Sequence, residues 1–237
     1  MVKKILIDHK GKKYFWNQGD LHTLYGVVKE KDILLGGDVM SHLGKKFLSF
    51  DAGFVDNILK LKKGPAFMTL KDIGVIISRI GICKESKIVE AGSGSGVLTS
   101  SLAQMSNHVT SYEYVQDHLN IAQKNLISLG LKAELKLQDI YQGIDEKNID
   151  VLILDLAEPW KVLEHGVKAL KSGGIFVSFV PQITQVIQLV EESLKFSYYF
   201  EECVENLERS WYVEGKKVRP HNQMLGHTGF LVFLRKI

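Results

Sequence analysis

A glycine-rich segment, VEAGSGSGVLTSSLA from Val89 to Ala103, places the strongest constraint on how this chain folds. The apolar residues before the glycines predict a buried strand over residues 87–91, and the apolar spacing after them predicts a helix over residues 96–105. The glycines at positions 92, 94 and 96 therefore lie in a strand-to-helix turn. A turn of this kind is typical of cofactor-binding proteins.

The chain beyond residue 62 alternates predicted strands with predicted helices. Strands are predicted over residues 87–91, 108–112, 133–137, 151–154, 174–180, 199–207 and 229–235, and helices over residues 71–80, 96–105, 115–129, 161–170 and 182–194. This alternation predicts an α/β fold with a doubly wound, mostly parallel, seven-stranded sheet in residues 63–237. The last two strands lack an intervening helix and are expected to pair antiparallel. Short apolar runs separated by turn residues predict a small β-rich domain of hairpins in residues 1–62.

Composition narrows the class of protein. A chain of 237 residues with 45% hydrophobic and 24% charged residues is expected to be a soluble globular protein. The net charge of +3 is too small to identify a polyanionic partner. Cys83 and Cys203 lie far apart without a metal-ligand pattern, so we predict free, buried thiols, no metal site and a cytoplasmic protein. Neither a signal peptide nor a membrane span is expected, because charges or polar residues interrupt each apolar run.

Acidic residues at the predicted strand ends distinguish between cofactors. A phosphate-binding P-loop needs a GK[ST] ending, and a dinucleotide-binding turn needs glycine or alanine at Val97. Glu113 ends the second strand about 20 residues after the glycines, where a carboxylate accepts hydrogen bonds from ribose hydroxyls. Asp139 ends the third strand, where it could accept from an adenine amine, and Glu90 would repel a pyrophosphate but favour an ammonium group. These features together favour S-adenosylmethionine.

The predicted cofactor site extends into the helix that follows the glycines. The carboxylate of S-adenosylmethionine is expected at the backbone amides of the first helical turn, where unpaired N–H groups favour an anion. His118 could reach the ribose. The predicted cofactor-binding residues are Glu90, Gly92, Gly94, Ser95, Gly96, Val97, Leu98, Glu113, His118, Asp139 and Asp155.

Structural roles alone could account for several of these residues. The glycines could form only a tight turn, Glu113 could cap the following helix, and Asp139 could be a turn residue. His118 could be an exposed helical histidine. Their joint placement at successive strand ends is what favours the cofactor site.

The segment LILDLAEPW ends the fourth predicted strand at Asp155. Because the carboxyl ends of the strands in a doubly wound sheet share one crevice, Asp155 is expected to face the reactive methyl group of the cofactor and to be the catalytic residue. Trp160 could stack on a substrate base or cover the hydrophobic core, and the core is the favoured interpretation.

These motifs resemble those of the tRNA (adenine-58-N1) methyltransferases in their single-gene archaeal and bacterial form. VEAGSGSGVLT is similar to the first motif of that family, SYEY to its ribose acid, QDIYQGI to its adenine motif, and LDLAEPW to its D-L-P-E-P-W, with Ala157 for the first proline. The ending RPHNQMLGHTGFLVFLRK resembles the family's R-P-x-x-x-M-x-G-H-T-G-F. This ending is the most specific similarity, because generic methyltransferases lack it. The segment DLHTLYGVVKEKDILLGG resembles the family's small N-terminal β-barrel.

The resemblance implies an S-adenosylmethionine-dependent class I methyltransferase that methylates N1 of a tRNA T-loop adenine at position 58, or also its neighbour at position 57. It also implies a homotetramer and tRNA as the partner. Two positions depart from the family: Thr69, in AFMTLKD, stands where relatives carry an aromatic residue or histidine, and Val115 stands where they often carry arginine. The base contacts near Thr69 are therefore left open.

Two basic segments are candidates for gripping RNA. Arg209, Lys216, Lys217 and Arg219 are interleaved with Trp211 and Tyr212, which could stack on bases. The segment KLKKG, residues 60–64, is the second candidate. Either could instead be a solvated surface segment.

Two other classes of function stay open at this point. A non-catalytic tRNA-binding partner subunit is expected to have a degraded glycine-rich turn, whereas this turn is intact. A protein-repair or small-molecule methyltransferase could carry a similar turn but not the Asp155 to Trp160 motif or the GHTG ending.

Overall fold

The chain forms two compact units, residues 1–62 and residues 63–237. The computed structural model describes residues 1–62, 64 and 67–237. Each unit has a hydrophobic cluster of its own, and we propose that each is a domain.

The smaller unit is built from short antiparallel strands. Its strands are β1 (Lys4–Asp8), β2 (Lys13–Trp16), β3 (Leu21–Thr23), β4 (Gly26–Val28), β5 (Gly37–Met40) and β6 (Lys46–Asp51). A four-stranded sheet has the order β2-β1-β6-β5, and β3 pairs with β4 in a separate hairpin. Alternate residues such as Leu6, Trp16 and Phe47 face a common core, as the twofold period of a strand requires.

Two short helices in the smaller unit were not expected from its hairpin pattern. These are α1 (Glu30–Leu35) and α2 (Phe54–Ile58). Ile33 of α1 is fully buried in the core, and Gly36, with φ 75°, ends the helix in a conformation that glycine favours. Helices this short carry too few turns to show a helical period in the sequence.

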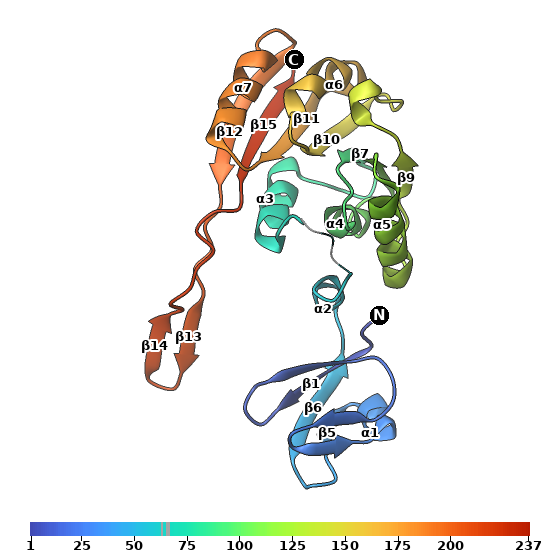
Figure 1. Ribbon diagram of the computed structural model, residues 1–237, viewed down its shortest axis with the longest axis vertical. Coiled ribbons are helices and arrows are strands. Elements are labelled where there is room, and N and C mark those ends of the chain that lie inside the picture. Colours follow the sequence, from blue (N-terminus) through green and yellow to red (C-terminus); the bar gives the residue numbers. More distant parts are fainter. Residues whose placement is uncertain (63, 65–66) are drawn as a thin grey trace. The chain divides into compact units, whose positions relative to one another are not determined.

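The larger unit is centred on a seven-stranded sheet with the order β12-β15-β11-β10-β7-β8-β9 (Figure 1). Its strands are β7 (Lys87–Ala91), β8 (His108–Glu113), β9 (Glu134–Leu137), β10 (Ile149–Asp155), β11 (Leu170–Val180), β12 (Tyr198–Glu205) and β15 (Phe230–Lys236). Only β15 is antiparallel to its neighbours β11 and β12. The predicted α/β class and the antiparallel pairing of the last two strands are confirmed.

Helices pack on the sheet in two groups. The helices are α3 (Leu70–Ile80), α4 (Val97–Ala103), α5 (Gln116–Leu129), α6 (Leu163–Ala169) and α7 (Ile183–Ser193), with the short 3-10 helices η1 (Ile140–Gln142) and η2 (Pro159–Val162). Contacts join α3 to α4 and α4 to α5, whereas α6 and α7 both contact β11 (Figure 1). Leu152 and Leu154, alternate residues of β10, pack in the same cluster as Leu163 of α6 and Leu189 of α7.

The connection between β12 and β15 forms a hairpin outside the central sheet. Its strands are β13 (Trp211–Glu214) and β14 (Lys217–Pro220), which pair only with each other (Figure 1). Most of its side chains are exposed, Trp211 among them. This hairpin carries the first of the two basic segments identified in the sequence.

Gly166 of α6 allows close packing against the sheet, and its replacement tests that packing. A Cβ at this position would lie 2.5 Å from Oη of Tyr198, whose hydroxyl donates to the Leu163 carbonyl at 3.1 Å. We expect Gly166→Ala to lower the free energy of unfolding by about 1–3 kcal/mol, the usual cost of overpacking.

The matched background is Tyr198→Phe, which removes the clashing oxygen. In the Tyr198→Phe background, Gly166→Ala should lower the free energy of unfolding by at least about 1 kcal/mol less than it does in the wild type. The new Cβ then has tight contacts with Leu152 and Phe176 but not with the removed oxygen. Urea denaturation of the two single variants and the double variant measures this difference. Strictly additive effects would contradict the proposed contact.

Candidate active site

The glycine-rich turn packs directly against the end of β10. Gly92, Gly94 and Gly96 have φ angles of 91°, 52° and 74°, in the left-handed region that favours glycine. A Cβ on Gly92 would lie 2.4 Å from the carbonyl oxygen of Asp155, and one on Gly96 would lie 3.0 Å from Cα of Ala122 in α5. Gly92 therefore brings the turn against Asp155, and Gly96 brings α4 against α5.

Glu113 fastens the turn to the next strand. One carboxylate oxygen accepts from the Gly94 amide at 3.0 Å, and the other accepts from the Val115 amide at 3.0 Å. The second bond lies just before α5, but that helix begins after Val115 without a side-chain cap, so the capping role considered for Glu113 is not found. The first bond holds the glycine-rich turn against β8.

A cavity of about 470 Å³ lies at the carboxyl ends of the strands. The predicted site residues that line it are Gly92, Gly94, Glu113, His118, Asp139 and Asp155. Its volume lies within the ordinary range for sites of small molecules and cofactors. The structure thus brings together residues from the ends of β7, β8, β9 and β10, which are far apart in the sequence.

Five predicted cofactor residues do not line this cavity. These are Glu90, Ser95, Gly96, Val97 and Leu98. The Gly96 amide already donates to the Ser93 carbonyl at 2.7 Å, so the expectation that this amide is available to an anion is wrong for this structure. The helix α4 begins at Val97, one residue later than expected, because Gly96 takes a left-handed conformation.

Asp139 and His118 lie on the same side of the cavity as Glu113. Asp139 accepts from the Tyr141 amide at 2.9 Å and starts η1, so the turn role considered for it is present. Nδ1 of His118 lies 3.8 Å from Oε1 of Glu113. Both side chains therefore have structural partners and line the cavity as well.

Burial makes two carboxyl groups reluctant to ionise. It raises the pKa of Asp155 to about 6 and that of Glu90 to about 7. The hydroxyls of Thr99 and Ser111 partly oppose the shift of Glu90, but neither carboxylate oxygen of Glu90 makes a hydrogen bond within the described part of the chain. The negative charges of Asp155 and Glu113 raise the pKa of Glu90 further. Such a group of acids favours a bound cation.

Sequence reasoning missed the apolar and aromatic lining of the cavity. The additional lining residues are Gly64, Ala91, Tyr112, Tyr114, Gln138, Ile140, Tyr141, Leu156, Ala157 and Glu158. Most of them are direct neighbours of the predicted acids. Their position next to the predicted acids could have identified them from the sequence, because consecutive residues at the end of a strand face the crevice.

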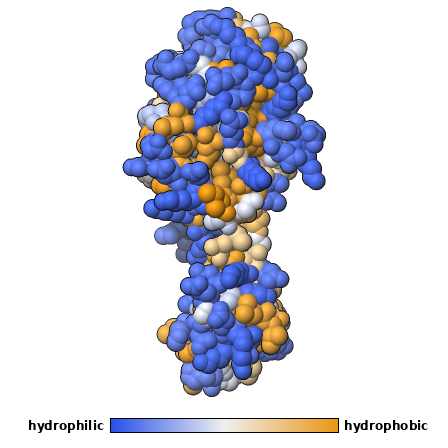
Figure 2. Space-filling view, turned by 90° about the vertical axis from the view of Figure 1, so that its right-hand side faces the viewer, coloured by the Kyte–Doolittle hydropathy of each residue, from blue (hydrophilic) through white to orange (hydrophobic). Residues whose placement is uncertain are grey.

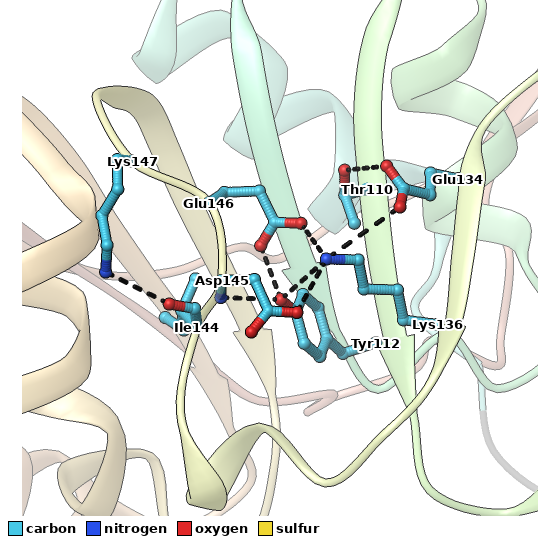
Figure 3. Close-up of polar contacts among 8 residues, drawn as sticks. All are labelled: Thr110, Tyr112, Glu134, Lys136, Ile144, Asp145, Glu146 and Lys147. Carbon is cyan, nitrogen blue, oxygen red and sulfur yellow. Dashed lines mark hydrogen bonds and ion pairs between the residues drawn. The ribbon is translucent and has the colours of Figure 1, made fainter.

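A polar network behind the cavity fixes Tyr112 (Figure 3). The Tyr112 hydroxyl donates to Glu146 at 2.6 Å and accepts from the Asp145 amide at 3.1 Å. Lys136 of β9 contacts the carboxylates of Glu146 and Asp145 at 2.5 and 3.0 Å. Burial first, and then the bond to Glu146, raise the pKa of Tyr112 to about 12. The network thus ties β8 and β9 to the segment that follows η1.

The segment after Asp155 serves both the cavity and the core. The Glu158 amide donates to the Tyr141 hydroxyl at 3.2 Å, and the Gln185 side chain donates to the Ala157 carbonyl at 2.8 Å. Trp160 is partly buried and packs against the main hydrophobic cluster, as the favoured interpretation expects.

The two basic segments differ in how far the structure describes them. In the hairpin, the Arg219 guanidinium lies 5.5 Å from the Tyr212 ring, the Arg209 guanidinium lies 5.9 Å from the Trp211 ring, and Lys216 and Lys217 are exposed. In the segment KLKKG, Lys63 lies outside the described residues, as does Ala66 of AFMTLKD.

The structure also bears on the predictions made for the cysteines, for a metal site and for a membrane span. Both cysteines are free, but Cys83 is exposed and Cys203 only partly buried, so the predicted burial is wrong for Cys83 and incomplete for Cys203. Cys83 lies in a surface turn between α3 and β7. Among residues 1–62, 64 and 67–237, no group of His, Cys, Asp and Glu side chains is arranged to hold a metal ion. Over the same residues, every helix is too short or too polar to cross a bilayer.

Substitution of Gly92 tests whether the turn must contact β10. Gly92→Ala is expected to weaken S-adenosylmethionine binding at least about tenfold, because the new Cβ would overlap the Asp155 carbonyl and displace the turn. Isothermal titration calorimetry measures the affinity. The matched control is Gly130→Ala, where φ is also positive at 68° but, apart from the neighbouring residues of the chain, the described residues have no atom within 4 Å of the new Cβ. Equal losses in both variants would show that backbone strain alone is responsible.

Comparison with known proteins agrees with this geometry. A family model described as the tRNA methyltransferase complex GCD14 subunit matches residues 59–219. TrmI of Methanocaldococcus jannaschii, a tRNA (adenine(57)-N(1)/adenine(58)-N(1))-methyltransferase, is 33% identical over 98% of this chain and 94% of its own length. TrmI of Thermus thermophilus, a tRNA (adenine(58)-N(1))-methyltransferase, is 32% identical over 98% and 96%.

Solved structures show the same architecture. A SAM-dependent O-methyltransferase from Thermotoga maritima superposes with a TM-score of 0.90 at 26% identity, covering 100% of this chain and 93% of its own. The tRNA (m1A58) methyltransferase TrmI from Aquifex aeolicus superposes with a TM-score of 0.83 at 26% identity, covering 99% and 96%. The fold is therefore that of the class I methyltransferases, and the chain belongs to the tRNA methyltransferase family that includes the TrmI enzymes.

Proposed function

We propose that this enzyme transfers a methyl group from S-adenosylmethionine to N1 of adenine 58 in the T-loop of tRNA, and that the adjacent position 57 is a second candidate. The observation that carries the proposal is the cavity at the carboxyl edge of the sheet, where Glu113, Asp139 and Asp155 converge. Family membership and the activities of the TrmI relatives support the choice of tRNA.

The residues of the cavity suit S-adenosylmethionine. Glu113 has two oxygens with further lone pairs for ribose hydroxyls, and the second oxygen of Asp139 could accept from the adenine amine. Burial disfavours the charged forms of Asp155 and Glu90, and a sulfonium or ammonium group bound near them would favour their ionisation and be stabilised in return. The intact glycine-rich turn argues against a non-catalytic partner subunit.

Catalysis by this site is mainly a matter of positioning. When bound, S-adenosylmethionine supplies an electrophilic methyl group on a sulfonium. N1 of adenine is a neutral lone pair, so no general base is required at the reacting atom once the two are aligned. An ionised Asp155 would accept a hydrogen bond from the 6-amino group and stabilise the positive charge that develops on the ring. Guanine has an acceptor at that place and would be rejected.

The surface of the larger unit bears on the assembly of the protein. Figure 2 shows hydrophobic side chains gathered on one face of the larger unit, a feature of surfaces that bind other subunits. We propose a homotetramer, because a chain of this size offers little surface to a whole tRNA and N1 must be freed from its pairing before it can react. A cytoplasmic location stays a prediction from the sequence.

A direct assay tests the proposed reaction. The purified chain is incubated with S-adenosylmethionine and an unmodified tRNA transcript, and the modified nucleoside is mapped. Transcripts with guanine at position 58, at position 57 or at both separate one target from two. Methylation of an isoaspartyl peptide instead of tRNA would support the protein-repair alternative, and cofactor binding without any transfer would support the partner-subunit alternative.

Asp155→Asn should separate activity from stability. Loss of one positioned electrostatic interaction is expected to lower kcat by about two to three orders of magnitude. The same change should raise the free energy of unfolding of the unliganded enzyme at pH 7 by about 1–3 kcal/mol, because it removes a buried carboxylate that is costly to ionise. Stopped assays and urea denaturation measure the two effects. A variant with kcat within about threefold of the wild type would remove Asp155 from this role.

The pH dependence follows from the raised pKa of Asp155. Between its ordinary value of 3.8 and about 6, the unfolded chain is ionised while the folded chain retains the proton. The stability of the wild type relative to Asp155→Asn should therefore decline as pH rises through this range, whereas kcat should increase over it. An Asp155→Asn variant with an unchanged acid limb in its residual activity would contradict the assignment.

The basic hairpin is proposed as a tRNA-binding element. A plot of the logarithm of tRNA affinity against the logarithm of salt concentration has a negative slope. Replacement of Lys216, Lys217 and Arg219 by alanine should reduce the magnitude of this slope by about two to three, because each of these cations would neutralise one phosphate. Fluorescence anisotropy over a range of KCl concentrations measures the slope.

A second triple variant provides the matched control. Lys168 of α6, Lys171 at the start of β11 and Lys195 just after α7 are exposed, and each pairs with an acidic residue outside the hairpin. Their replacement removes the same charge and should leave the slope unchanged. Equal slopes for both triple variants would show that the hairpin does not bind tRNA and is a solvated surface segment.

A further inference from the structure

The GHTGF segment near the C-terminus, residues 226–230, contains a histidine whose two ring nitrogens both face acceptors. Nδ1 of His227 lies 2.6 Å from a carboxylate oxygen of Glu205, and Nε2 lies 2.8 Å from the Pro181 carbonyl. A neutral imidazole has one N–H, so only the protonated ring can donate to both partners. His227 therefore joins the end of β12, the residue after β11 and the segment before β15.

The next residue of the same segment contacts a buried lysine. The side chain of Lys71 is 8% exposed, and its ammonium group lies 2.7 Å from Asp72 Oδ1, 2.7 Å from the Asn206 carbonyl and 2.6 Å from Thr228 Oγ1. These three acceptors match the three donors of an ammonium group. The Asn206 side chain donates back to the Lys71 carbonyl at 3.1 Å. Removal of any one acceptor would leave a costly gap around a buried charge.

This cluster lies at the start of α3. Thr69 precedes the helix and donates from its hydroxyl to Asp72 at 2.7 Å, and the Asp72 amide donates to the Thr69 carbonyl at 3.1 Å. Asp72 is 1% exposed and is held by Thr69 on one oxygen and Lys71 on the other. The first turn of α3 is thus fastened to the segments that flank β12 and β15.

The cluster also lies on the same edge of the sheet as the candidate active site. Asp155 pairs in register with Phe179 of β11, and Pro181 follows two residues later. Gly64, five positions before Thr69, lines the cavity. The Lys71 cluster therefore anchors the start of α3, six residues after this residue of the cavity lining.

We propose that Thr228 and His227 fix the first turn of α3 beside the active site, and that Thr228, His227 and Lys71 are positioning residues for the target adenine. The inference rests on the proposed function, since it assigns the anchored segment a part in placing the base against Asp155. A misplacement of about 1 Å can cost on the order of a hundredfold in rate, so a shift of α3 that is passed on to the bound base is expected to lower kcat.

The charges around His227 set the expected pH dependence. Glu205 on β12 and the Pro181 carbonyl after β11 raise the pKa of His227, and the more distant ammonium of Lys71 opposes them. The imidazolium is present below this raised pKa and is lost as pH rises through it. The anchoring should therefore weaken as pH rises through this raised pKa, opposite in direction to the acid limb expected from Asp155.

A pair of substitutions at Thr228 tests the anchor with little change in volume. Thr228→Val keeps the shape but removes the acceptor for Lys71, whereas Thr228→Ser keeps the hydroxyl. We expect Thr228→Val to lower kcat on tRNA at least tenfold with the affinity for S-adenosylmethionine within about twofold, and Thr228→Ser to retain most of the activity. Equal activity of the two variants, or a parallel loss of cofactor affinity, would overturn the proposal.

His227→Gln tests the charge, with His108→Gln as the control. His108 lies 3.5 Å from Glu85 at the start of β8, on the opposite edge of the sheet. The alkaline fall in kcat should disappear in His227→Gln and persist in His108→Gln. Persistence of that fall in His227→Gln would overturn the role of His227.

Hydrogen exchange tests the anchor without relying on the substrate. In Thr228→Val and His227→Gln, the amides of the first turn of α3, among them Asp72, should exchange at least about fivefold faster, while the amides of β8 stay unchanged. Unchanged exchange in α3, or faster exchange with wild-type kcat, would overturn the proposal. If the two variants show the faster exchange but the wild-type enzyme does not methylate tRNA, the proposed function is contradicted and the anchor is not.

Discussion

The contact between the glycine-rich turn and the end of β10 is the constraint on which the site depends. Because Gly92 has no side chain, the turn after β7 can lie against the Asp155 carbonyl. Glu113 then holds the turn from β8 through the Gly94 amide. Three strand ends are thereby fixed relative to one another, and the cavity is the space they leave. A side chain at position 92 would separate them and enlarge or close that space.

The order of strands and helices in the larger unit was predictable because each element is long enough to show its period. The strand at residues 87–91 was predicted with its observed bounds. The predicted helix at residues 161–170 instead divides into η2 and α6, since Pro159 starts a 3-10 turn. The helices α1 and α2 of the smaller unit were missed, because five or six residues carry too little periodic signal.

The acids of the site were predictable because each lies at, or within two residues of, the end of a strand. The sequence could not reveal how their hydrogen bonds are used. Glu113 and Asp139 both serve the backbone as well as the cavity, and Glu90 is buried behind the cavity wall. The partners of Lys71 were also out of reach, because Asn206 and Thr228 are more than a hundred residues away and meet it only through the antiparallel edge of the sheet.

The buried, unpaired carboxyl group of Glu90 has a consequence for ligand exchange. With a pKa of about 7, it carries a proton on a substantial fraction of unliganded molecules at neutral pH. A cation bound in the neighbouring cavity would favour the ionised form of Glu90, so its binding would be coupled to release of that proton. The affinity of the site for a cationic ligand would then rise with pH over the range in which Glu90 ionises.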